Sequence, residues 1–145
     1  MLVRQILSSK PSLPIVTVQA DAKVSEAARL LAEKRIGAVI VSADGASVDG
    51  ILSERDIVRE LGKRGGGCLD DAVSSLMTNA VIACHPGDSV LSVLEKMTDG
   101  RFRHMPVIED GAMIGVVSIG DAVKARIDEV ESENSALTDM IAGTA

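Results

Sequence analysis

Aromatic side chains are nearly absent from this 145-residue chain, which contains one Phe and neither Tyr nor Trp. Proteins that bind single-stranded nucleic acids stack the bases on several aromatic rings, so this scarcity argues against such a partner. The net charge of −6 likewise argues against a surface that follows the phosphates of a duplex. We therefore expect no nucleic-acid partner.

Long apolar runs and frequent cysteines are missing as well. No apolar stretch approaches the roughly 18 residues that cross a bilayer, and the first residues lack the apolar core of a signal peptide. Cys68 and Cys84 are too few for a disulfide framework or a four-ligand metal site. The sequence thus predicts a cytoplasmic protein with reduced thiols, without bound metal and without a membrane partner.

The chain does contain enough apolar material for a folded core. Hydrophobic residues make up 46% of the sequence and charged residues 25%, which is typical of globular proteins. Within this material an apolar helical pattern occurs twice: residues 24–31 place apolar side chains at i, i+3, i+4 and i+7, and residues 90–97 repeat the pattern 66 positions later. Short β-branched or apolar segments precede the two copies at 15–18 and 81–84 and follow them at 38–41 and 105–108.

The end of each copy also matches. A turn signal, Asp44-Gly45 or Asp110-Gly111, leads to a second apolar strand at 50–53 or 115–118, and a helix then starts near Asp56 or Asp121. Neither half is large enough to bury its own sheet face. The sequence therefore predicts an α/β (α+β) fold of two β-α-β-β-α repeats, at 1–65 and 66–124, packed about a pseudo-two-fold axis. Such packing creates two equivalent clefts.

Three further segments complete the predicted organisation. Short helices at 3–7 and 73–77 lead into the repeats, and the glycines of 62–67 indicate a flexible linker. The tail at 125–145 belongs to neither repeat. A line of apolar residues with one Asn runs into this tail with the alternating spacing of four and three residues that is typical of a coiled-coil heptad. These residues are Val123, Ile127, Val130, Asn134, Leu137 and Ile141. A terminal helix that packs on its own domain is the preferred interpretation, and a helix that pairs in a dimer is the alternative.

The pattern Ser-x-x-Asp occurs at the strand-to-helix junction of both repeats, at Ser53-Glu54-Arg55-Asp56 and Ser118-Ile119-Gly120-Asp121. One interpretation is a helix capping box. The other is a nucleotide site, because a helix N-terminus and a Ser hydroxyl suit a phosphate, and a carboxylate suits the two hydroxyls of a ribose. The occurrence of the pattern at equivalent places in both repeats favours the nucleotide site.

A basic segment, Arg101-Phe102-Arg103-His104, precedes the middle strand of the second repeat. It suits either a solvated loop or a clamp on phosphate, because Arg binds phosphate with two parallel hydrogen bonds. The matching segment of the first repeat, Arg35-Ile36-Gly37-Ala38, carries only one cation. We therefore expect the basic segment to strengthen the site of the second repeat, and the two clefts to differ in affinity or in ligand.

The order of these segments, twice in one chain, resembles a tandem pair of cystathionine-β-synthase (CBS) domains, the Bateman module. The resemblance covers roughly residues 3–123 and is carried above all by residues 50–58 and 103–107. It implies a non-catalytic regulatory module that senses energy or redox state by binding AMP, ADP, ATP or NAD(H). It also implies a flat homodimer and an unidentified protein that the module regulates.

The resemblance assigns roles to individual residues as well. Asp56 and Asp121 would bind ribose, and Ser53 and Ser118 would face phosphate. Adenine would meet the backbone at Thr17, Val18, Ile82 and Ala83, the base would pack on Ala38, Val39, Met105 and Pro106, phosphates would meet Arg101, Arg103 and His104, and Arg55 completes the ligand-binding set.

Three other functions are alternatives to a nucleotide-binding module. In a ligand-free oligomerisation scaffold, both Ser-x-x-Asp segments would be helix caps only, and the heptad tail supports that alternative. An S-adenosylmethionine sensor would use the same clefts. An enzyme would need a catalytic group in a cleft, for which His104 is the candidate, and we expect no catalytic activity.

Overall fold

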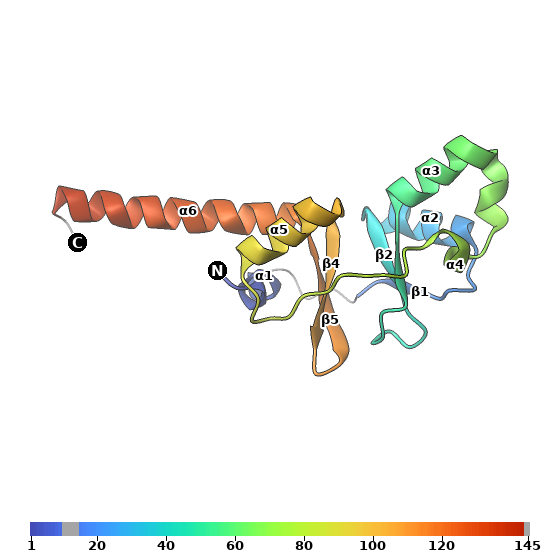
Figure 1. The fold of residues 1–145 in the computed structure, drawn as a ribbon, viewed down its shortest axis with the longest axis horizontal. Helices are drawn as coiled ribbons and strands as arrows, with labels where there is room; N and C mark the ends of the chain where they lie inside the picture. Colours follow the sequence, from blue (N-terminus) through green and yellow to red (C-terminus); the bar gives the residue numbers. More distant parts are fainter. Residues whose placement is uncertain (10–14, 144–145) are drawn as a thin grey trace.

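Two small β-sheets with their helices form the body of the molecule, and one long helix projects from it (Figure 1). The computed structural model describes residues 1–9 and 15–143. Its elements follow the chain in the order α1 (Val3–Ser9), β1 (Thr17–Val18), α2 (Val24–Lys34), β2 (Ala38–Val41), β3 (Gly50–Ser53), α3 (Glu54–Arg64), η1 (Gly65–Asp70), α4 (Val73–Leu76), α5 (Val90–Gly100), β4 (His104–Glu109), β5 (Ala112–Ser118) and α6 (Ile119–Ala142).

The first unit is built on a sheet of order β1-β2-β3. Strand β1 runs parallel to β2, and β2 runs antiparallel to β3 with Ala38 opposite Ser53. The apolar stripe of α2 at Val24, Ala27 and Leu31 is buried against this sheet. The predicted helix and the predicted strands at 38–41 and 50–53 are thus confirmed, whereas the first strand is shorter than expected.

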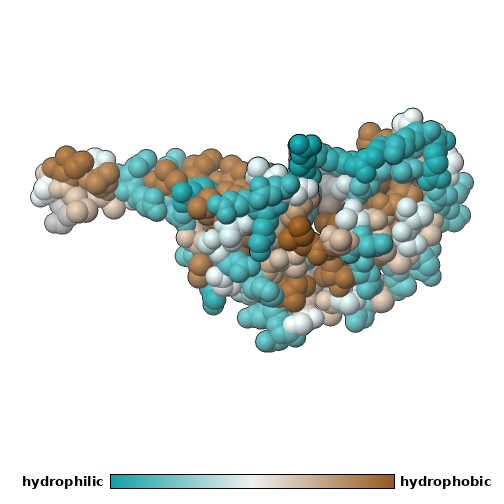
Figure 2. Space-filling model, in the orientation of Figure 1, coloured by the Kyte–Doolittle hydropathy of each residue, from teal (hydrophilic) through white to brown (hydrophobic). Residues whose placement is uncertain are grey.

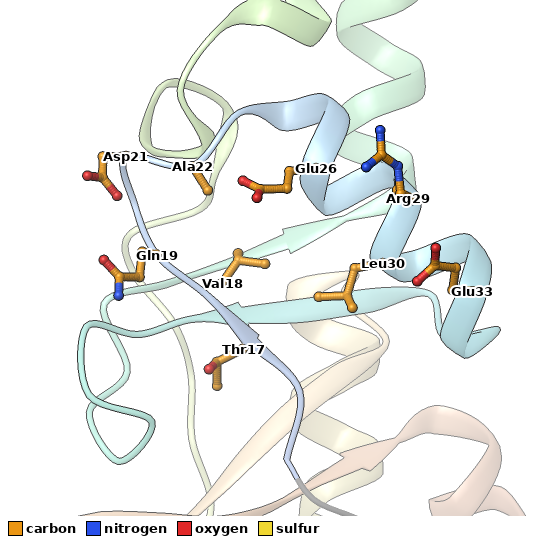
Figure 3. Close-up of a pocket in the computed structure, with 9 residues that line it drawn as sticks. All are labelled: Thr17, Val18, Gln19, Asp21, Ala22, Glu26, Arg29, Leu30 and Glu33. Atoms are coloured by element: carbon orange, nitrogen blue, oxygen red, sulfur yellow. The ribbon is translucent and has the colours of Figure 1, made fainter.

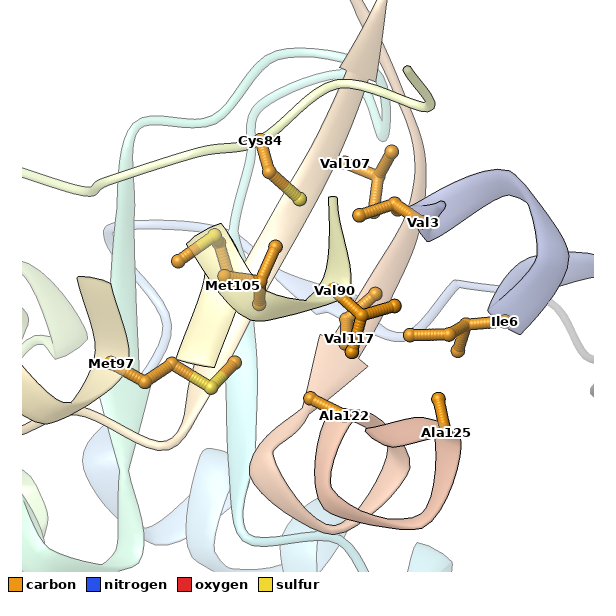
Figure 4. Packing of buried hydrophobic residues seen from close by; sticks show 11 residues of the cluster. Val3, Ile6, Cys84, Val90, Met97, Met105, Val107, Val117, Ala122 and Ala125 are labelled. Carbon is orange, nitrogen blue, oxygen red and sulfur yellow. The ribbon is translucent and has the colours of Figure 1, made fainter. Parts of the chain in front are cut away.

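The second unit has a two-stranded antiparallel sheet, β4-β5, covered by α5 and the start of α6 (Figure 4). The strand expected at 81–84 is wrong, because only Cys84 pairs there, in an isolated bridge with Val107 of β4. The segment before Cys84 crosses from one sheet to the other, so its backbone cannot run along either sheet. The expected helices and strands of this repeat otherwise form.

The short lead-in helices are exchanged between the two units. Val3 and Ile6 of α1 are buried in the core of the second unit, where Val3 lies beside Val107 (Figure 4). Val73 of α4 is buried in the core of the first unit. Each packed unit therefore uses a helix from outside its own predicted segment, 1–65 or 66–124.

The glycine-rich segment at 62–67 does not form a flexible linker. Helix α3 continues to Arg64, and η1 follows directly and buries Cys68 completely. The Arg64 guanidinium lies 2.8 Å from Glu60 and 2.6 Å from Asp71, which fixes this corner on both sides. The expectation failed because a buried anchor and two ion pairs compensate for the conformational freedom of the glycines.

Helix α6 leaves the body after its first turns. Ala122 and Ala125 are buried against the second unit, whereas every described residue from 131 to 143 is exposed. The preferred interpretation, a helix packed on its own domain, therefore holds only for the start of α6.

No helix within residues 1–9 and 15–143 combines the length and apolar character needed to cross a membrane.

We predict that Gly50→Ala destabilises the protein by about 1–3 kcal/mol, the usual cost of overpacking. A Cβ at the buried Gly50 would lie 2.6 Å from Met77 Sδ and 3.0 Å from the Thr78 carbonyl oxygen. Urea unfolding followed by circular dichroism measures the change. Gly62→Ala is the matched control: a Cβ there meets no atom within 4 Å, so we expect a gain of about 0.5–1 kcal/mol from higher helix propensity. Equal midpoints for wild type and Gly50→Ala would contradict this packing.

Candidate functional site

Two clefts separate the units, and each contains one Ser-x-x-Asp segment. The Asp56 cleft has a volume of about 330 Å³ and includes Ser53 and Asp56. The Asp121 cleft has a volume of about 610 Å³ and includes Ser118 and Asp121. Both carboxylates are half-buried within a concavity. The volumes lie in the range of small-molecule sites.

The chain segment after α4 forms one wall of the Asp56 cleft. Thr78 exchanges two backbone hydrogen bonds with Ile51 of β3, at 2.9 and 3.0 Å. Six residues later the Cys84 N–H donates to the Pro106 carbonyl of β4, at 3.0 Å. The intervening residues therefore bridge the two sheets, and Ala80, Val81 and Ile82 among them line the cleft.

Each cleft combines parts of both repeats. The Asp56 cleft joins Ser53 and Asp56 of the first repeat with residues 100–104 of the second. The Asp121 cleft joins Ser118 and Asp121 of the second repeat with residues 34–38 of the first. The basic segment thus faces Asp56, which differs from the expectation that it strengthens the site of its own repeat. The reason is the face-to-face packing, which sets the loops of each sheet opposite the helix start of the other.

Both Ser-x-x-Asp segments also form complete capping boxes. Ser53 Oγ accepts from the Asp56 N–H at 3.2 Å, and Asp56 Oδ2 accepts from the Ser53 N–H at 3.0 Å. Ser118 and Asp121 repeat these bonds at 3.1 and 3.0 Å. Each serine hydroxyl keeps its own proton to donate. Asp56 Oδ1 lies 3.5 Å from the guanidinium of Arg59, which also lines the cleft. Capping and ligand binding are therefore compatible.

An arginine in a left-handed backbone conformation opens the loop at the edge of each cleft. Arg35 ends α2 with φ 53°, and Arg101, at the equivalent position 66 residues later, ends α5 with φ 55°. This conformation is uncommon for residues other than glycine, and it occurs often at functional sites. Arg35 lines the Asp121 cleft and was not among the predicted site residues, although the 66-residue shift from Arg101 identifies it.

The two clefts differ in charge and polarity. Four arginines line the Asp56 cleft, together with the carboxylates of Glu54 and Asp56. Among the residues that the structure describes, Lys34 and Arg35 are the Lys and Arg side chains that line the Asp121 cleft, and its other walls are largely apolar. The arginines of the first cleft are Arg55, Arg59, Arg101 and Arg103, and the apolar residues of the second include Leu7, Ile15, Ile40, Ile114 and Val116.

His104 lines both clefts. Its ring packs on Gly37, where a Cβ would lie 3.2 Å from His104 Cε1. Glycine at position 37 therefore leaves the room in which the imidazole sits between the two clefts.

Several predicted site residues lie outside these two clefts. Thr17 and Val18 line a separate, open hollow beside α2, together with Asp21, Glu26 and other residues (Figure 3). The side chains of Val39 and Met105 are buried in the two hydrophobic cores, Pro106 is buried in β4, and Ala83 lines neither cleft. The expectation that Val39 and Met105 pack on a base is wrong, because strand alternation turns these side chains into the cores.

The two cysteines and the other side chains of residues 1–9 and 15–143 that could bind a metal form no cluster of three or more. Cys68 and Cys84 are both free and completely buried, and burial raises the pKa of the Cys84 thiol to about 11. Within the part of the chain that the structure describes, no three His, Cys, Asp or Glu side chains converge on one point as metal ligands would.

We predict that Ser53→Ala and Ser118→Ala each lower the free energy of unfolding by about 1 kcal/mol, the usual cost of losing an N-cap. Each change removes the acceptor for one backbone N–H at a helix start. Thermal or urea unfolding measures the loss. Ser132→Ala, at an exposed position within α6, serves as the control and is expected to be neutral. Unchanged stability in both cap variants would contradict the capping geometry.

Comparison with known proteins shows a close resemblance over most of the chain. The sequence model of the CBS domain matches residues 3–63 and 73–128. The mitochondrial CBS domain-containing protein CBSX3 of Arabidopsis thaliana is 37% identical over 127 residues, which cover 85% of this chain. This chain spans 62% of the length of that relative.

Solved structures share the fold. The CBS-domain containing protein ATU1752 from Agrobacterium tumefaciens superposes with a TM-score of 0.82 at 41% identity, over 87% of this chain and 99% of that one. The CBS domain protein PAE2072 from Pyrobaculum aerophilum, complexed with AMP, gives a TM-score of 0.73 at 27% identity, over 83% and 89% of the two chains.

Proposed function

This chain belongs to the CBS domain family, and we propose that it is a non-catalytic regulatory module that binds adenosine nucleotides in the clefts between its two units. The complex of PAE2072 with AMP supports an adenosine-type ligand. AMP, ADP, ATP and NAD(H) are the proposed ligands, and S-adenosylmethionine is the alternative.

The composition of the Asp56 cleft is the observation that carries this proposal. A carboxylate, a serine hydroxyl and the first turn of α3 come from one repeat, and Arg101 and Arg103 come from the other. The Asp56 carboxylate suits the two hydroxyls of a ribose, and Ser53 and the helix start suit a phosphate. Arginine adds bidentate contacts to further phosphate oxygens. The cleft therefore provides groups for both ends of a nucleotide.

We propose that the Asp121 cleft takes a less charged adenosine ligand than the Asp56 cleft. Ser118 and Asp121 repeat the ribose and phosphate groups, and within residues 1–9 and 15–143 the lysine and arginine side chains beside them are Lys34 and Arg35. The apolar walls suit a ligand that buries carbon atoms instead of several phosphate oxygens. A nucleoside monophosphate or S-adenosylmethionine fits this composition better than a triphosphate.

Binding between two units offers a direct route to regulation. A ligand that contacts both repeats stabilises the arrangement of the units that it fits best, and it shifts the population in proportion to this preference. We propose that a homodimer in the cytoplasm reports this shift to a protein that it regulates. We propose that His104 takes part in binding only and that the module is non-catalytic.

The ligand-free scaffold is the second candidate, and the closed capping boxes favour it. Ser53 and Asp56, like Ser118 and Asp121, already satisfy each other's backbone N–H groups without a ligand. In a scaffold these four side chains would contribute to stability alone. Substitution of Asp121 by Ala separates the two candidates, because the scaffold loses only stability whereas the nucleotide module also loses binding.

We predict that Asp56→Ala weakens the binding of AMP and ATP on the order of 10- to 100-fold, as expected when a charged hydrogen-bond acceptor is lost. Calorimetric titration of the full chain with AMP, ATP, NADH and S-adenosylmethionine gives the dissociation constants. Asp128→Ala, an exposed position on α6, controls for the change in charge. Absence of heat with all four ligands at millimolar concentration would refute the nucleotide module, and wild-type affinity of Asp56→Ala would refute the assigned cleft.

We predict further that Arg101→Gln weakens ATP binding about tenfold and adenosine binding much less, because it removes a phosphate partner. A double-mutant cycle tests the crosswise construction of the cleft. The effects of Arg101→Gln and Asp56→Ala on ATP affinity should not add, since both side chains contact one ligand, whereas Arg101→Gln and Asp121→Ala should add. Coupling to Asp121 instead of Asp56 would show that each repeat forms its own site.

A further inference from the structure

An apolar stripe on α6 has no partner within the part of the chain that the structure describes. Its side chains range in exposed fraction from 36% at Val130 to 80% at Ile141. Figure 2 shows hydrophobic surface continuing along α6 beyond the body of the molecule. We call these residues the α6 seam: Val123, Ile127, Val130, Asn134, Leu137 and Ile141.

The outer part of the α6 seam lies beyond the CBS unit itself. The family match ends at residue 128, whereas α6 continues to Ala142. This extension packs on neither hydrophobic core. An isolated helix of a few turns is marginally stable in water, so the extension needs a partner that covers its apolar stripe.

We infer that the occupant is a second copy of this chain, whose α6 pairs with the first in a parallel two-stranded coiled coil. The 4-3 spacing places Ile127, Asn134 and Ile141 at one core position of the heptad, and Val123, Val130 and Leu137 at the other. A β-branched residue at the first of these positions favours two strands. This pairing would form the interface of the proposed homodimer, and it does not depend on nucleotide binding.

Asn134 selects the parallel orientation. In a parallel pair the Asn134 amides of the two copies face each other in the same layer and can hydrogen-bond across the seam. In an antiparallel pair each amide faces an apolar residue of the other core position and remains unsatisfied. A single Asn at such a position is a known determinant of register and of two-stranded assembly.

The charges that flank the α6 seam agree with the same orientation. Arg126 directly precedes the core residue Ile127, and Glu131 directly follows the core residue Val130. In a parallel coiled coil these flanking positions of opposite helices meet, so Arg126 of one copy lies beside Glu131 of the second, and the pair occurs twice by symmetry. The Arg126 guanidinium is partly exposed and already pairs with Glu129, so it can extend this ion pair into a small network.

The bodies of two copies leave room for this pairing. Ala122 and Ala125 turn one face of α6 toward the second unit. At about 100° per residue, the α6 seam points roughly a third of a turn away from that face. A two-fold axis parallel to α6 then places the two bodies on opposite sides of the coiled coil, and neither body covers the other's seam.

Sedimentation of the full chain at micromolar concentration, without nucleotide, tests the interface. We expect wild type to sediment as a dimer and Leu137→Asp/Ile141→Asp to sediment as a monomer. The matched control, Ser135→Asp/Ala136→Asp, adds the same charge outside the seam and should remain dimeric. These four positions are exposed, so we expect the body to fold in every variant. A monomeric wild type, or a seam variant that sediments as a dimer, overturns the proposal.

Disulfide trapping tests the orientation. Cys68 and Cys84 are completely buried, so an introduced thiol on α6 is the accessible one. Under mild oxidation Leu137→Cys should give a covalent dimer on a non-reducing gel, because equivalent core positions of a parallel pair face each other. Ser135→Cys should not. A dimer in which Leu137→Cys fails to cross-link overturns the parallel arrangement. Nucleotide titration of the same variants reports separately on the clefts.

Discussion

Neither repeat completes a core with its own contiguous segment, and this constraint organises the rest of the molecule. Val3 of α1 is buried in the second unit, and Val73 of α4 is buried in the first. Backbone hydrogen bonds accompany both exchanges: the Val3 N–H donates to the Asp88 carbonyl at 2.9 Å, and the Val73 N–H donates to the Ala22 carbonyl at 2.8 Å. The helix that precedes each unit in the sequence therefore packs in the core of the other unit. This exchange joins the two sheets into one body.

The clefts follow from this exchange. A chain that must pass from a helix on one unit to a strand of the other crosses the gap between the sheets, as the segment from Thr78 to Cys84 does. The crossing segment occupies an edge of the gap and leaves a cleft beside it. An equivalent backbone hydrogen bond anchors the loop of each repeat to its second helix: the Glu54 N–H donates to Gly37, and the Ile119 N–H donates to Arg103. Duplication thus preserves the frame, while the side chains on it have diverged.

The divergence of those side chains gives the molecule two unlike clefts on a nearly symmetric frame. The loop that carries Arg103 supplies extra cations to the Asp56 cleft, whereas its counterpart carries Gly37 and leaves the Asp121 cleft more apolar. His104 lies between both clefts, against Gly37. The same imidazole therefore lines both clefts and forms a direct structural link between them.

The sequence by itself determined the duplication, the type of most elements, both capping boxes and the heptad spacing of α6, because these depend on residues a few positions apart. The sequence wrongly predicted a strand at 81–84 and a flexible linker at 62–67. It also predicted that the side chains of Val39 and Met105 face a ligand, whereas they are buried in the cores. Only the tertiary structure decided which segments share a cleft and which face of α6 remains uncovered. The physical reason is that an apolar period shows which face of an element is buried, but it does not specify what that face is buried against.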